Sequence, residues 1–483
     1  MIVWYKKLSI FCYNKLYITY YFVLGYSMTV EELLYQYRMI YYDFPQSLKI
    51  FLGSLYGNIP LSIRFGEGYN SHTKIIQKFE NANEQYKLDF MYNKTLETLL
   101  FAEKNIPYYK DIFNKYGISS KSFKSLDDIN LFPLLTKNDI KKNLDKIYTQ
   151  KIEKTVSYYS GGSLSTPTKF FLPVSTRAKE KAYNNYIFSK IKYQHRDKSL
   201  LLKGREIVNV KKDIFWEYEP VENFFLLSTN YLNSEKFSIM YTKVKEFKPR
   251  FLIGYPSAVL SFIKQSKLYN LNKLDIAGVI LTSETIYKDE LQSIQEYFGV
   301  DVLTHYGHTE RNIIGYRINR SMYNFMNSYG LVREKNSELI TTTFDNFTMP
   351  FINYKSGDSV VGSINHYETT DIIKEVENIE GRTQDYLVTK DKRLISITSM
   401  YYNRDKLFEQ VNAIQYIQEK IGEVTVLIES TEINPKVLEK TMNQNLAYKG
   451  LDITVHVVQE IKKSARGKRI VCIQKLDIDN IKL

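Results

Sequence analysis

Residues 276–310 read IAGVILTSETIYKDELQSIQEYFGVDVLTHYGHTE, and this stretch decides the fold. Its first part, IAGVILTSE (276–284), is a short apolar run that predicts a buried strand. A helix is predicted next, over residues 287–298, because one of its sides carries the apolar positions Leu291, Ile294 and Phe298. The last part, VDVLTHYGHTE (300–310), begins as a second strand. Two strands joined by one helix predict a parallel βαβ unit.

Polar residues follow the apolar part of both predicted strands. Thr282-Ser283-Glu284 ends the first strand, and HYGHTE (305–310) ends the second. A further strand is predicted upstream at FLIGY (251–255), where Pro256 suits the first turn of a following helix. Ligands of parallel sheets bind beyond the carboxyl ends of the strands. We therefore expect the functional site at this edge of the sheet.

The part of the chain before this sheet reads differently. Residues 29–150 are mainly helical in pattern, and no internal repeat stands out. Asn93 is expected to cap a helix that Pro107 stops. Thr136 and Asp139 have the spacing of a capping box, which predicts another helix start.

The part after the βαβ unit changes pattern twice. Residues 337–360 predict extended segments joined by a turn at Met349-Pro350. Beyond residue 386, a small α+β domain is predicted from the successive segments VTVLIES, PKVLEKTMNQNLAYK, DITVHVVQEI and RIVCIQKL.

Together these patterns predict an α/β protein of two domains. A large N-terminal domain with parallel βαβ units is expected over residues 29–380, and a small mobile C-terminal domain over 387–483. The hinge between them is expected at 381–386, and residues 1–28 form a separate apolar N-terminal segment.

Composition limits the class of protein. The chain has 483 residues, 44% of them hydrophobic and 25% charged, which is typical of soluble globular proteins. Its two cysteines, Cys12 and Cys472, supply neither a disulfide framework nor a thiolate metal site, and its six histidines lack zinc spacing. A reducing cytoplasm fits this usage. The net charge of +13 comes with no nucleic-acid-binding motif, so we expect no nucleic-acid partner.

The apolar segment 8–26, LSIFCYNKLYITYYFVLGY, follows the pair Lys6-Lys7. Asn14 and Lys15 interrupt it, so it does not read as a membrane span. Three interpretations stay open: a peripheral interfacial anchor, a packed N-terminal helix, or residues upstream of a start at Met28. Any association with a membrane is expected to be peripheral.

Several short motifs could carry chemistry, each with a plainer structural alternative. SYYSGGSLSTPTKF (157–170) offers the small and hydroxyl residues that approach phosphates, but such clusters are also ordinary loops. THYGHTE (304–310) combines a ring, a glycine, a hydroxyl and a carboxylate, or it is a βα turn. Asp358, Arg382 and the basic loop SARGKRIV (464–471) are each unremarkable alone.

In this order, the motifs resemble the adenylate-forming superfamily of acyl-CoA synthetases and adenylation domains. The similarity covers residues 90–476 and is greatest to phenylacetate–CoA ligase-like proteins of capsular polysaccharide synthesis. The segments typical of that branch are NIPYYKDIF, LFPLLTKNDI and FLIGYPSAVLSFIK.

The resemblance implies a role for each matching residue. The loop around the ATP phosphates would contain Ser160, Gly161, Gly162, Ser163 and Thr166. Tyr306 and Gly307 would flank the adenine and acyl group, Thr309 would contact the α-phosphate, and Glu310 would bind Mg²⁺. Asp358 would bind the ribose with Arg382 nearby, Asp385 would be the hinge, and Lys468 would steady the α-phosphate.

The implied activity is activation of a small carboxylic acid with ATP and Mg²⁺, followed by acyl transfer to an amine, a hydroxyl, CoA or a carrier thiol. A carboxylate attacks the α-phosphorus and pyrophosphate leaves, so charge stabilisation is needed and a protein nucleophile is not.

Two alternatives to this activity stay open. One is a true acyl-CoA ligase, with CoA as a cofactor. The other is a catalytically silent binding protein of the same fold, because Leu164 and Ser165 replace a threonine and a glycine usual in the phosphate loop. No motif identifies the acid, the acceptor or the oligomeric state.

Overall fold

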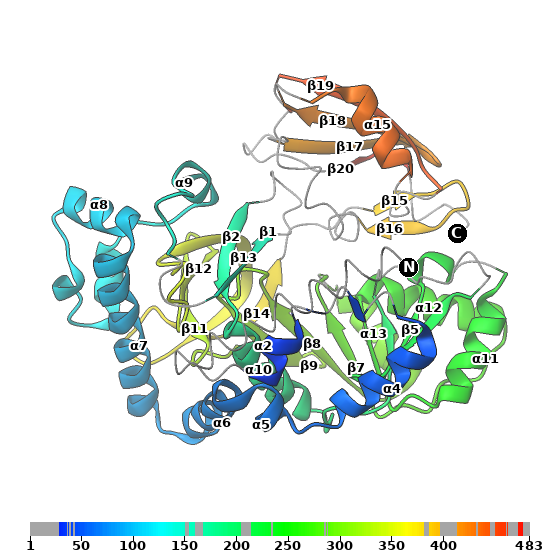
Figure 1. Cartoon of the computed structure of the whole chain (residues 1–483), viewed down its shortest axis with the longest axis horizontal. Helices are drawn as coiled ribbons and strands as arrows, with labels where there is room; N and C mark the ends of the chain where they lie inside the picture. Colours follow the sequence, from blue (N-terminus) through cyan, green and yellow to red (C-terminus); the bar gives the residue numbers. More distant parts are fainter. Residues whose placement is uncertain are drawn as a thin grey trace, which may run out of the picture.

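The computed structural model describes residues 29–35, 37, 40–41, 44–149, 154–159, 168–203, 214–232, 235–284, 286, 288–380, 386–396, 413–430, 433–444, 450–459, 461 and 472–476. Its main feature is a mixed sheet of 12 strands, which confirms the predicted α/β class (Figure 1). The strand order is β11-β12-β13-β14-β10-β9-β8-β7-β6-β3-β5-β4. One half of this sheet is parallel and the other half is antiparallel.

The parallel half contains the strands predicted from the apolar runs. It consists of β3 (Ser199–Leu202), β5 (Phe224–Leu227), β6 (Phe251–Gly254), β7 (Gly278–Thr282) and β8 (Asp301–Gly307), edged by antiparallel β4 (Trp216–Glu219). β7 pairs in parallel with both β6 and β8, as the βαβ pattern predicts. The strands are buried on both faces, because Leu252 and Val279 face one core while Ile253 and Ile280 face another.

Helices cover both faces of these strands (Figure 1). The first core packs against α11 (Phe237–Phe247), α12 (Pro256–Leu268) and α13 (Lys288–Phe298). The second core includes α10 (Thr176–Ser189) and α6 (Gly66–Asn81). Pro256 occupies the first turn of α12, as expected. Gly299 follows α13 with φ +72°, a left-handed conformation that suits a helix end.

The antiparallel half curls instead of extending flat. Its strands are β9 (Ile314–Ile318), β10 (Tyr323–Phe325), β11 (Gly330–Lys335), β12 (Glu338–Thr343), β13 (Tyr354–His366) and β14 (Ile373–Glu380). A bridge joins Arg333 of β11 to Ile372, just before β14, so β11 and β14 meet although β12 and β13 lie between them in the strand order. These strands therefore curve around a small apolar core of their own.

The N-terminal part is helical up to residue 142, among the residues that the structure describes. Its helices are α2 (Val30–Tyr35), α4 (Gln46–Gly57), α5 (Leu61–Arg64), α6, α7 (Glu84–Asn105), α8 (Pro107–Tyr116), α9 (Lys137–Lys142) and the short turns η1 (Ser120–Ser122) and η2 (Leu126–Leu131). The capping box at Thr136 and Asp139 is confirmed. The predicted cap at Asn93 is wrong, because Asn93 lies inside α7 and Asn83 caps it by accepting from the Tyr86 amide. The amphipathic pattern that suggested a start at Asn93 covers only the later part of α7, whereas the helix itself begins at Glu84.

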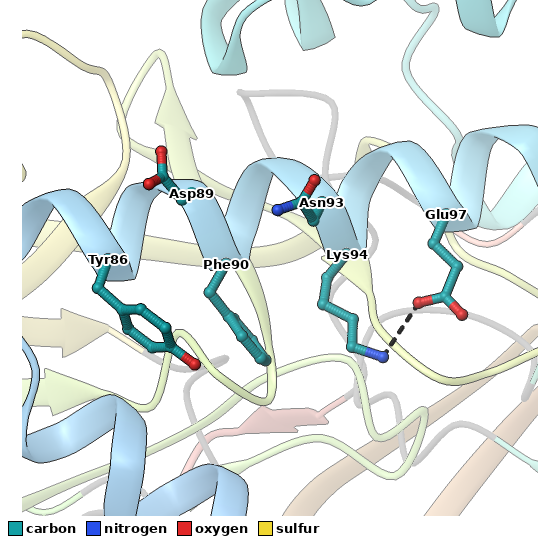
Figure 2. Close-up of a pocket in the computed structure, with 6 residues that line it drawn as sticks. All are labelled: Tyr86, Asp89, Phe90, Asn93, Lys94 and Glu97. Atoms are coloured by element: carbon teal, nitrogen blue, oxygen red, sulfur yellow. Dashed lines mark hydrogen bonds and ion pairs between the residues drawn. The ribbon is translucent and has the colours of Figure 1, made fainter.

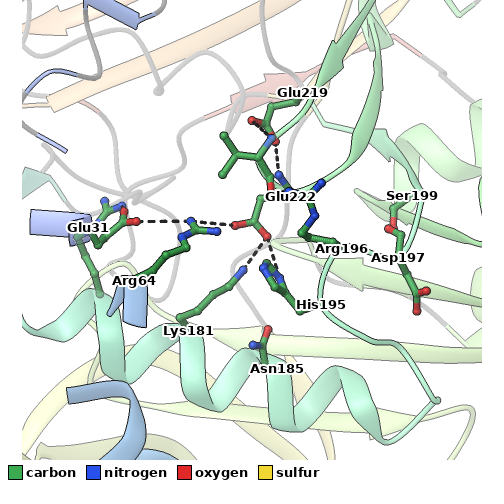
Figure 3. A network of polar contacts seen from close by, with 12 residues as sticks. Glu31, Arg64, Lys181, Asn185, His195, Arg196, Asp197, Ser199, Glu219 and Glu222 are labelled. Atoms are coloured by element: carbon green, nitrogen blue, oxygen red, sulfur yellow. Dashed lines mark hydrogen bonds and ion pairs between the residues drawn. The ribbon is translucent and has the colours of Figure 1, made fainter. Parts of the chain in front are cut away.

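A polar network fastens the first helices to the sheet (Figure 3). Glu31 of α2 pairs with Arg64 of α5 at 3.5 Å, and Arg64 lies 3.9 Å from Glu222 beside β5. Lys181 of α10 reaches Glu222 at 2.6 Å. Glu222 is half-buried, and burial would raise its pKa, but the charges of Lys181 and His195 outweigh this and lower it. The carboxylate therefore stays charged and holds the cations around it.

The C-terminal elements form a second, smaller sheet. Its order is β19-β18-β17-β20, from β17 (Ala413–Lys420), β18 (Glu423–Glu429), β19 (Asp452–Val458) and β20 (Cys472–Gln474), with α15 (Pro435–Gln444) packed on it. The hairpin β15 (Tyr386–Val388) and β16 (Leu394–Ser396) precedes this sheet. Arg393 of this hairpin lies 5.5 Å from the ring centre of Tyr231 in η4 (Thr229–Tyr231), a short helical turn after β5. The hairpin therefore contacts the part of the protein that contains the large sheet (Figure 1). Residues 381–385 of the predicted hinge lie outside the described residues, and the domain boundaries stay a prediction.

Among the described residues, no helix is both long and apolar enough to cross a bilayer.

A buried charge cluster joins the N-terminal helices to β12. Lys179 of α10 donates to the Tyr329 and Phe344 carbonyls and to Asp345 at 2.8–3.0 Å. Lys94 of α7 also donates to Asp345, at 2.7 Å. Burial alone would raise the pKa of Asp345, but the two ammonium groups outweigh it and hold that pKa well below its usual range.

We predict that Asp345→Ala lowers the free energy of unfolding by about 3–5 kcal/mol, because it leaves buried Lys179 without its carboxylate. Urea unfolding at neutral pH measures the change. The matched control is Glu246→Ala, which removes the exposed Lys243–Glu246 pair and should cost no more than about 0.5 kcal/mol. Equal losses of unfolding free energy in the two variants would contradict the prediction that Asp345 stabilises the fold more than an exposed ion pair does.

His72 lies beside this cluster and supplies a pH-dependent prediction. Burial, aided by the charge of Lys179, lowers the pKa of His72 to about 4. Between pH 6.5 and that value the unfolded chain binds a proton that the folded chain does not, so stability falls as the pH falls. His72→Gln should reduce this loss by about 1–2 kcal/mol between pH 6.5 and 5. Exposed His366→Gln, measured by the same unfolding series, should leave the slope unchanged.

Candidate active site

Three side chains meet just beyond the carboxyl end of β8. The Tyr306 hydroxyl donates to Oδ2 of Asp358 at 2.8 Å. Nε2 of His308 lies 2.9 Å from the same oxygen and 2.8 Å from the Tyr306 hydroxyl. The other ring nitrogen of His308 lies 3.0 Å from Oδ1 of Asn312, which is fully buried. Two residues predicted from separate motifs, Tyr306 and Asp358, are thus in direct contact.

A local irregularity of β13 delivers Asp358 to this point. The pairing of β12 with β13 shifts register between Glu338 and Ile340, and Gly357 has φ +89°. Only glycine adopts this conformation without strain, so the sequence Gly-Asp marks a bulge that turns Asp358 toward β8. The glycine of NYKSGD therefore helps to set where Asp358 lies, which the composition of the motif alone did not reveal.

Glu310 lies on the same loop but in a different environment. It is buried, whereas Thr309 before it and Gly307 are exposed. Its Oε1 accepts a hydrogen bond from the Tyr354 hydroxyl at 3.0 Å. Tyr354 begins β13, so one strand orients both carboxylates, Asp358 and Glu310. Tyr354 and His308 were not singled out in the sequence, because each needs the tertiary contact to acquire a role.

Arg311 ties this loop to its surroundings. Its φ is +52°, and its guanidinium donates to Thr176 at 2.8 Å and pairs with Glu180 at 3.2 Å, both on α10. The same group lies 5.5 Å from the ring centre of Tyr158 in β1 (Thr155–Tyr159). β1 pairs antiparallel with β2 (Lys169–Pro173), and these strands flank residues 160–167. The β1–β2 hairpin is thus held, through Tyr158 and Arg311, beside the loop after β8.

Two further titratable groups lie at this edge of the sheet. Burial lowers the pKa of Lys203, directly after β3, to about 8. Burial, with the charge of Lys203 adding to it, lowers the pKa of His305 to about 4. His305 belongs to the segment HYGHTE (305–310) that the sequence places at this edge, whereas Lys203 was not identified from the sequence, where it is one basic residue among many.

Several predicted site residues lie outside the described part of the chain. They are Ser160, Gly161, Gly162, Ser163 and Thr166 of the phosphate loop, with Leu164 and Ser165, and also Arg382, Asp385 and Lys468. The described part of the candidate site therefore consists of the β8 loop, β13 and the base of the β1–β2 hairpin.

Two hollows formed by described residues do not contain the Tyr306–His308–Asp358 contact, although the second borders Asp358 through Ser356 and Gly357. One, of about 210 Å³, is a shallow depression along α7, where Lys94 bonds to Glu97 (Figure 2). The other, of about 260 Å³, is lined by Thr136, Lys137, Asn138, Glu338, Lys355, Ser356 and Gly357. Neither contains the contacts between motifs described above, and those contacts define the candidate site better than either hollow.

The arrangement supplies two carboxylates with different partners, a phenol, an imidazole and an exposed hydroxyl at one sheet edge. Acidic groups that accept hydrogen bonds from fixed donors suit recognition of sugar hydroxyls or cations. No Ser-His-Asp or Cys-His arrangement lies at this edge among the described residues.

No family model matches the chain. Protein CapK of Staphylococcus aureus is 25% identical over 467 residues, covering 92% of this chain and 99% of CapK. Among solved structures, 2-hydroxyisobutyryl-CoA ligase in complex with 2-HIB-AMP and CoA has a TM-score of 0.52 at 13% identity, covering 81% of this chain and 90% of that one. The same ligase in the postadenylation state has a TM-score of 0.48 at 12% identity, covering 80% and 88%. The chain is therefore similar to CapK over nearly its whole length, and it shares the fold of 2-hydroxyisobutyryl-CoA ligase.

Proposed function

We propose that this protein uses ATP to activate a small carboxylic acid as an acyl-adenylate and then transfers the acyl group, in the synthesis of a capsular or surface polysaccharide. The observation that carries the proposal is the contact of Tyr306 and His308 with Asp358 beyond β8. It joins two motifs 52 residues apart at the edge where parallel sheets bind ligands. The similarity to CapK over nearly the whole chain supports the biological setting.

The described residues of the candidate site each have a role in this proposal. Asp358 accepts hydrogen bonds from the ribose hydroxyls, and Tyr306 and Gly307 flank the adenine and the acyl group. The exposed hydroxyl of Thr309 contacts the α-phosphate. Donation from Tyr306 and His308 keeps the Asp358 carboxylate oriented, so less freedom is lost when the nucleotide binds.

Glu310 suits a magnesium ion that is bound mainly through substrate phosphates. Mg²⁺ commonly takes one or two carboxylates together with phosphate oxygens and water. Glu310 offers one buried carboxylate, oriented by Tyr354, next to the loop that carries Thr309. When bound, the metal would neutralise charge on the phosphates.

The base of the β1–β2 hairpin supports a phosphate-binding role for the residues that it flanks. Arg311 holds Tyr158 of β1 beside the β8 loop. Ser160, Gly161, Gly162, Ser163 and Thr166 would then offer amides and hydroxyls to the phosphates. Arg382 and Lys468, from the C-terminal part of the chain, would add positive charge near the phosphates.

The reaction proceeds in two steps. A carboxylate oxygen of the acid attacks the α-phosphorus, the bond to the bridging oxygen breaks, and pyrophosphate leaves. An amine, hydroxyl or thiol then attacks the acyl carbon and releases AMP. CoA is a specific candidate for this acceptor, because the neighbour of known structure holds an acyl-AMP together with CoA.

The nucleotide assignment predicts that Asp358→Ala weakens ATP binding several-fold, since an unpaired ribose hydrogen bond costs about 1–3 kcal/mol. Calorimetry with ATP and Mg²⁺ measures the change. Asp89→Ala on α7, within the hollow of Figure 2, is the matched control and should bind as the wild type does. Equal affinity of the Asp358 and Asp89 variants would remove Asp358 from the nucleotide site.

The assignment of Lys468 predicts an asymmetric loss between the two steps. Lys468→Ala should slow acyl-adenylate formation by about two to four orders of magnitude, the scale for one preorganised charged donor. Acyl transfer from a supplied acyl-adenylate should change much less, because that step breaks the acyl C–O bond and leaves the bonds to the α-phosphorus unchanged. Pyrophosphate release and AMP release, measured separately, test this. Equal slowing of both steps would place Lys468 outside the adenylation machinery.

A further inference from the structure

Helix α4 has its apolar side turned to solvent. Its residues with the spacing i, i+3, i+4 and i+7 are Leu48, Phe51, Leu52 and Leu55, and all four are exposed, Phe51 by 61% and Leu55 by 57%. A surface helix of a globular protein normally directs such a stripe into the core. We call these four residues the α4 face.

The opposite side of α4 is fixed to the sheet by small and polar residues. A side chain at Gly53 would collide with Pro220, and one at Gly57 would collide with Arg196 and lie 2.6 Å from the Val221 carbonyl. Lys49 is buried and lies 3.6 Å from Glu217 of β4. Gln46 donates to the Tyr218 carbonyl at 2.8 Å. These contacts leave the helix no freedom to rotate its apolar side inward, so the exposure is built into the fold.

No acidic residue in the stretch that carries the α4 face opposes an anionic partner. Residues 46–64 contain no Asp or Glu, and their two charges, Lys49 and Arg64, are both cationic and engaged on the protein side. The whole chain carries a net charge of +13. An apolar helix face on a cationic protein is the combination that binds anionic bilayers, through burial of apolar area and electrostatic attraction.

The chain outside the described residues joins the fold at this same place. Residues 1–28, with the Lys6-Lys7 pair and the apolar segment 8–26, lead directly into α2. The Tyr56 hydroxyl of α4 donates to the Glu31 carboxylate of α2, so α2 lies against α4. Apolar and cationic sequence therefore continues from the border of the α4 face.

We propose that the α4 face is a docking surface for an anionic lipid bilayer. α4 lies in the plane of the membrane, with Phe51 and Leu55 entering the boundary between headgroups and acyl chains. The binding is peripheral, because no described helix is long enough to span a bilayer. α4 and α5 lie along one side of the large sheet, away from the C-terminal sheet, so a membrane there leaves the candidate site accessible (Figure 1).

Flotation of the full chain with lipid vesicles tests the proposal. Vesicles of phosphatidylcholine with phosphatidylglycerol should bind the wild type, and phosphatidylcholine alone should bind it more weakly. The double variant Phe51→Ser/Leu55→Ser should lower the bound fraction about tenfold or more, because apolar insertion supplies much of the affinity. Ile239→Ser on α11, also exposed, is the matched control and should bind like the wild type. ATP affinity should be equal in all three proteins, which shows that the folds are intact.

A fluorescent reporter locates the contact independently. Phe51→Trp emission should shift to shorter wavelength on anionic vesicles and be quenched by brominated lipids, whereas Ile239→Trp emission should do neither. Three results would overturn the proposal. The double variant could float like the wild type, so that another segment such as residues 1–28 carries the binding. The wild type could fail to bind vesicles, with Phe51→Trp emission already blue-shifted in solution, so that a segment of the chain covers the face. Light scattering could instead find a dimer that the double variant converts to a monomer, so that a second copy covers it.

Discussion

The curvature of the antiparallel half of the sheet determines the candidate site. In the strand order, β13 lies four positions from β8, and adjacent strands are about 4.8 Å apart, so a flat sheet would separate them by about 19 Å. A hydrogen bond of 2.8 Å between Tyr306 and Asp358 requires the strands to curl back toward β8. The bridge between β11 and Ile372 and the irregular register of β13 provide this curl. The site therefore depends on long-range sheet geometry as much as on the residues that form it.

The local part of the fold follows from the sequence. The strands β6, β7 and β8 and the helix α13 were predictable because each has a strong apolar pattern and a clear stop signal, such as Gly299. The start of α7 was not, because its first turns carry a weaker apolar pattern than the segment after Asn93. Short-range spacing measures how amphipathic a segment is, and that is a different quantity from where its hydrogen bonds begin.

The site was predictable only in its separate parts. Tyr306, Glu310 and Asp358 could be singled out as motif residues, yet nothing local fixes which of them touch. His308 and Tyr354 gain their significance only through Asp358 and Glu310, across contacts of 50 and 44 residues in sequence. Residues of this kind depend on strand order and curvature, which no local pattern encodes. The phosphate loop, Arg382 and Lys468 remain inferences from resemblance.

Arg311 makes the hairpin, the loop after β8 and α10 into one mechanical unit. A single guanidinium contacts Tyr158, Thr176 and Glu180, and its left-handed backbone fixes the direction from which it reaches them. Any shift of β1 toward a bound ligand must either break the Tyr158 contact or carry α10 along. Because α10 also bears Lys179, which binds Asp345 together with Lys94 of α7, such a shift would also be transmitted to α7. The hairpin can therefore move only with α10 or by losing its contact with Arg311.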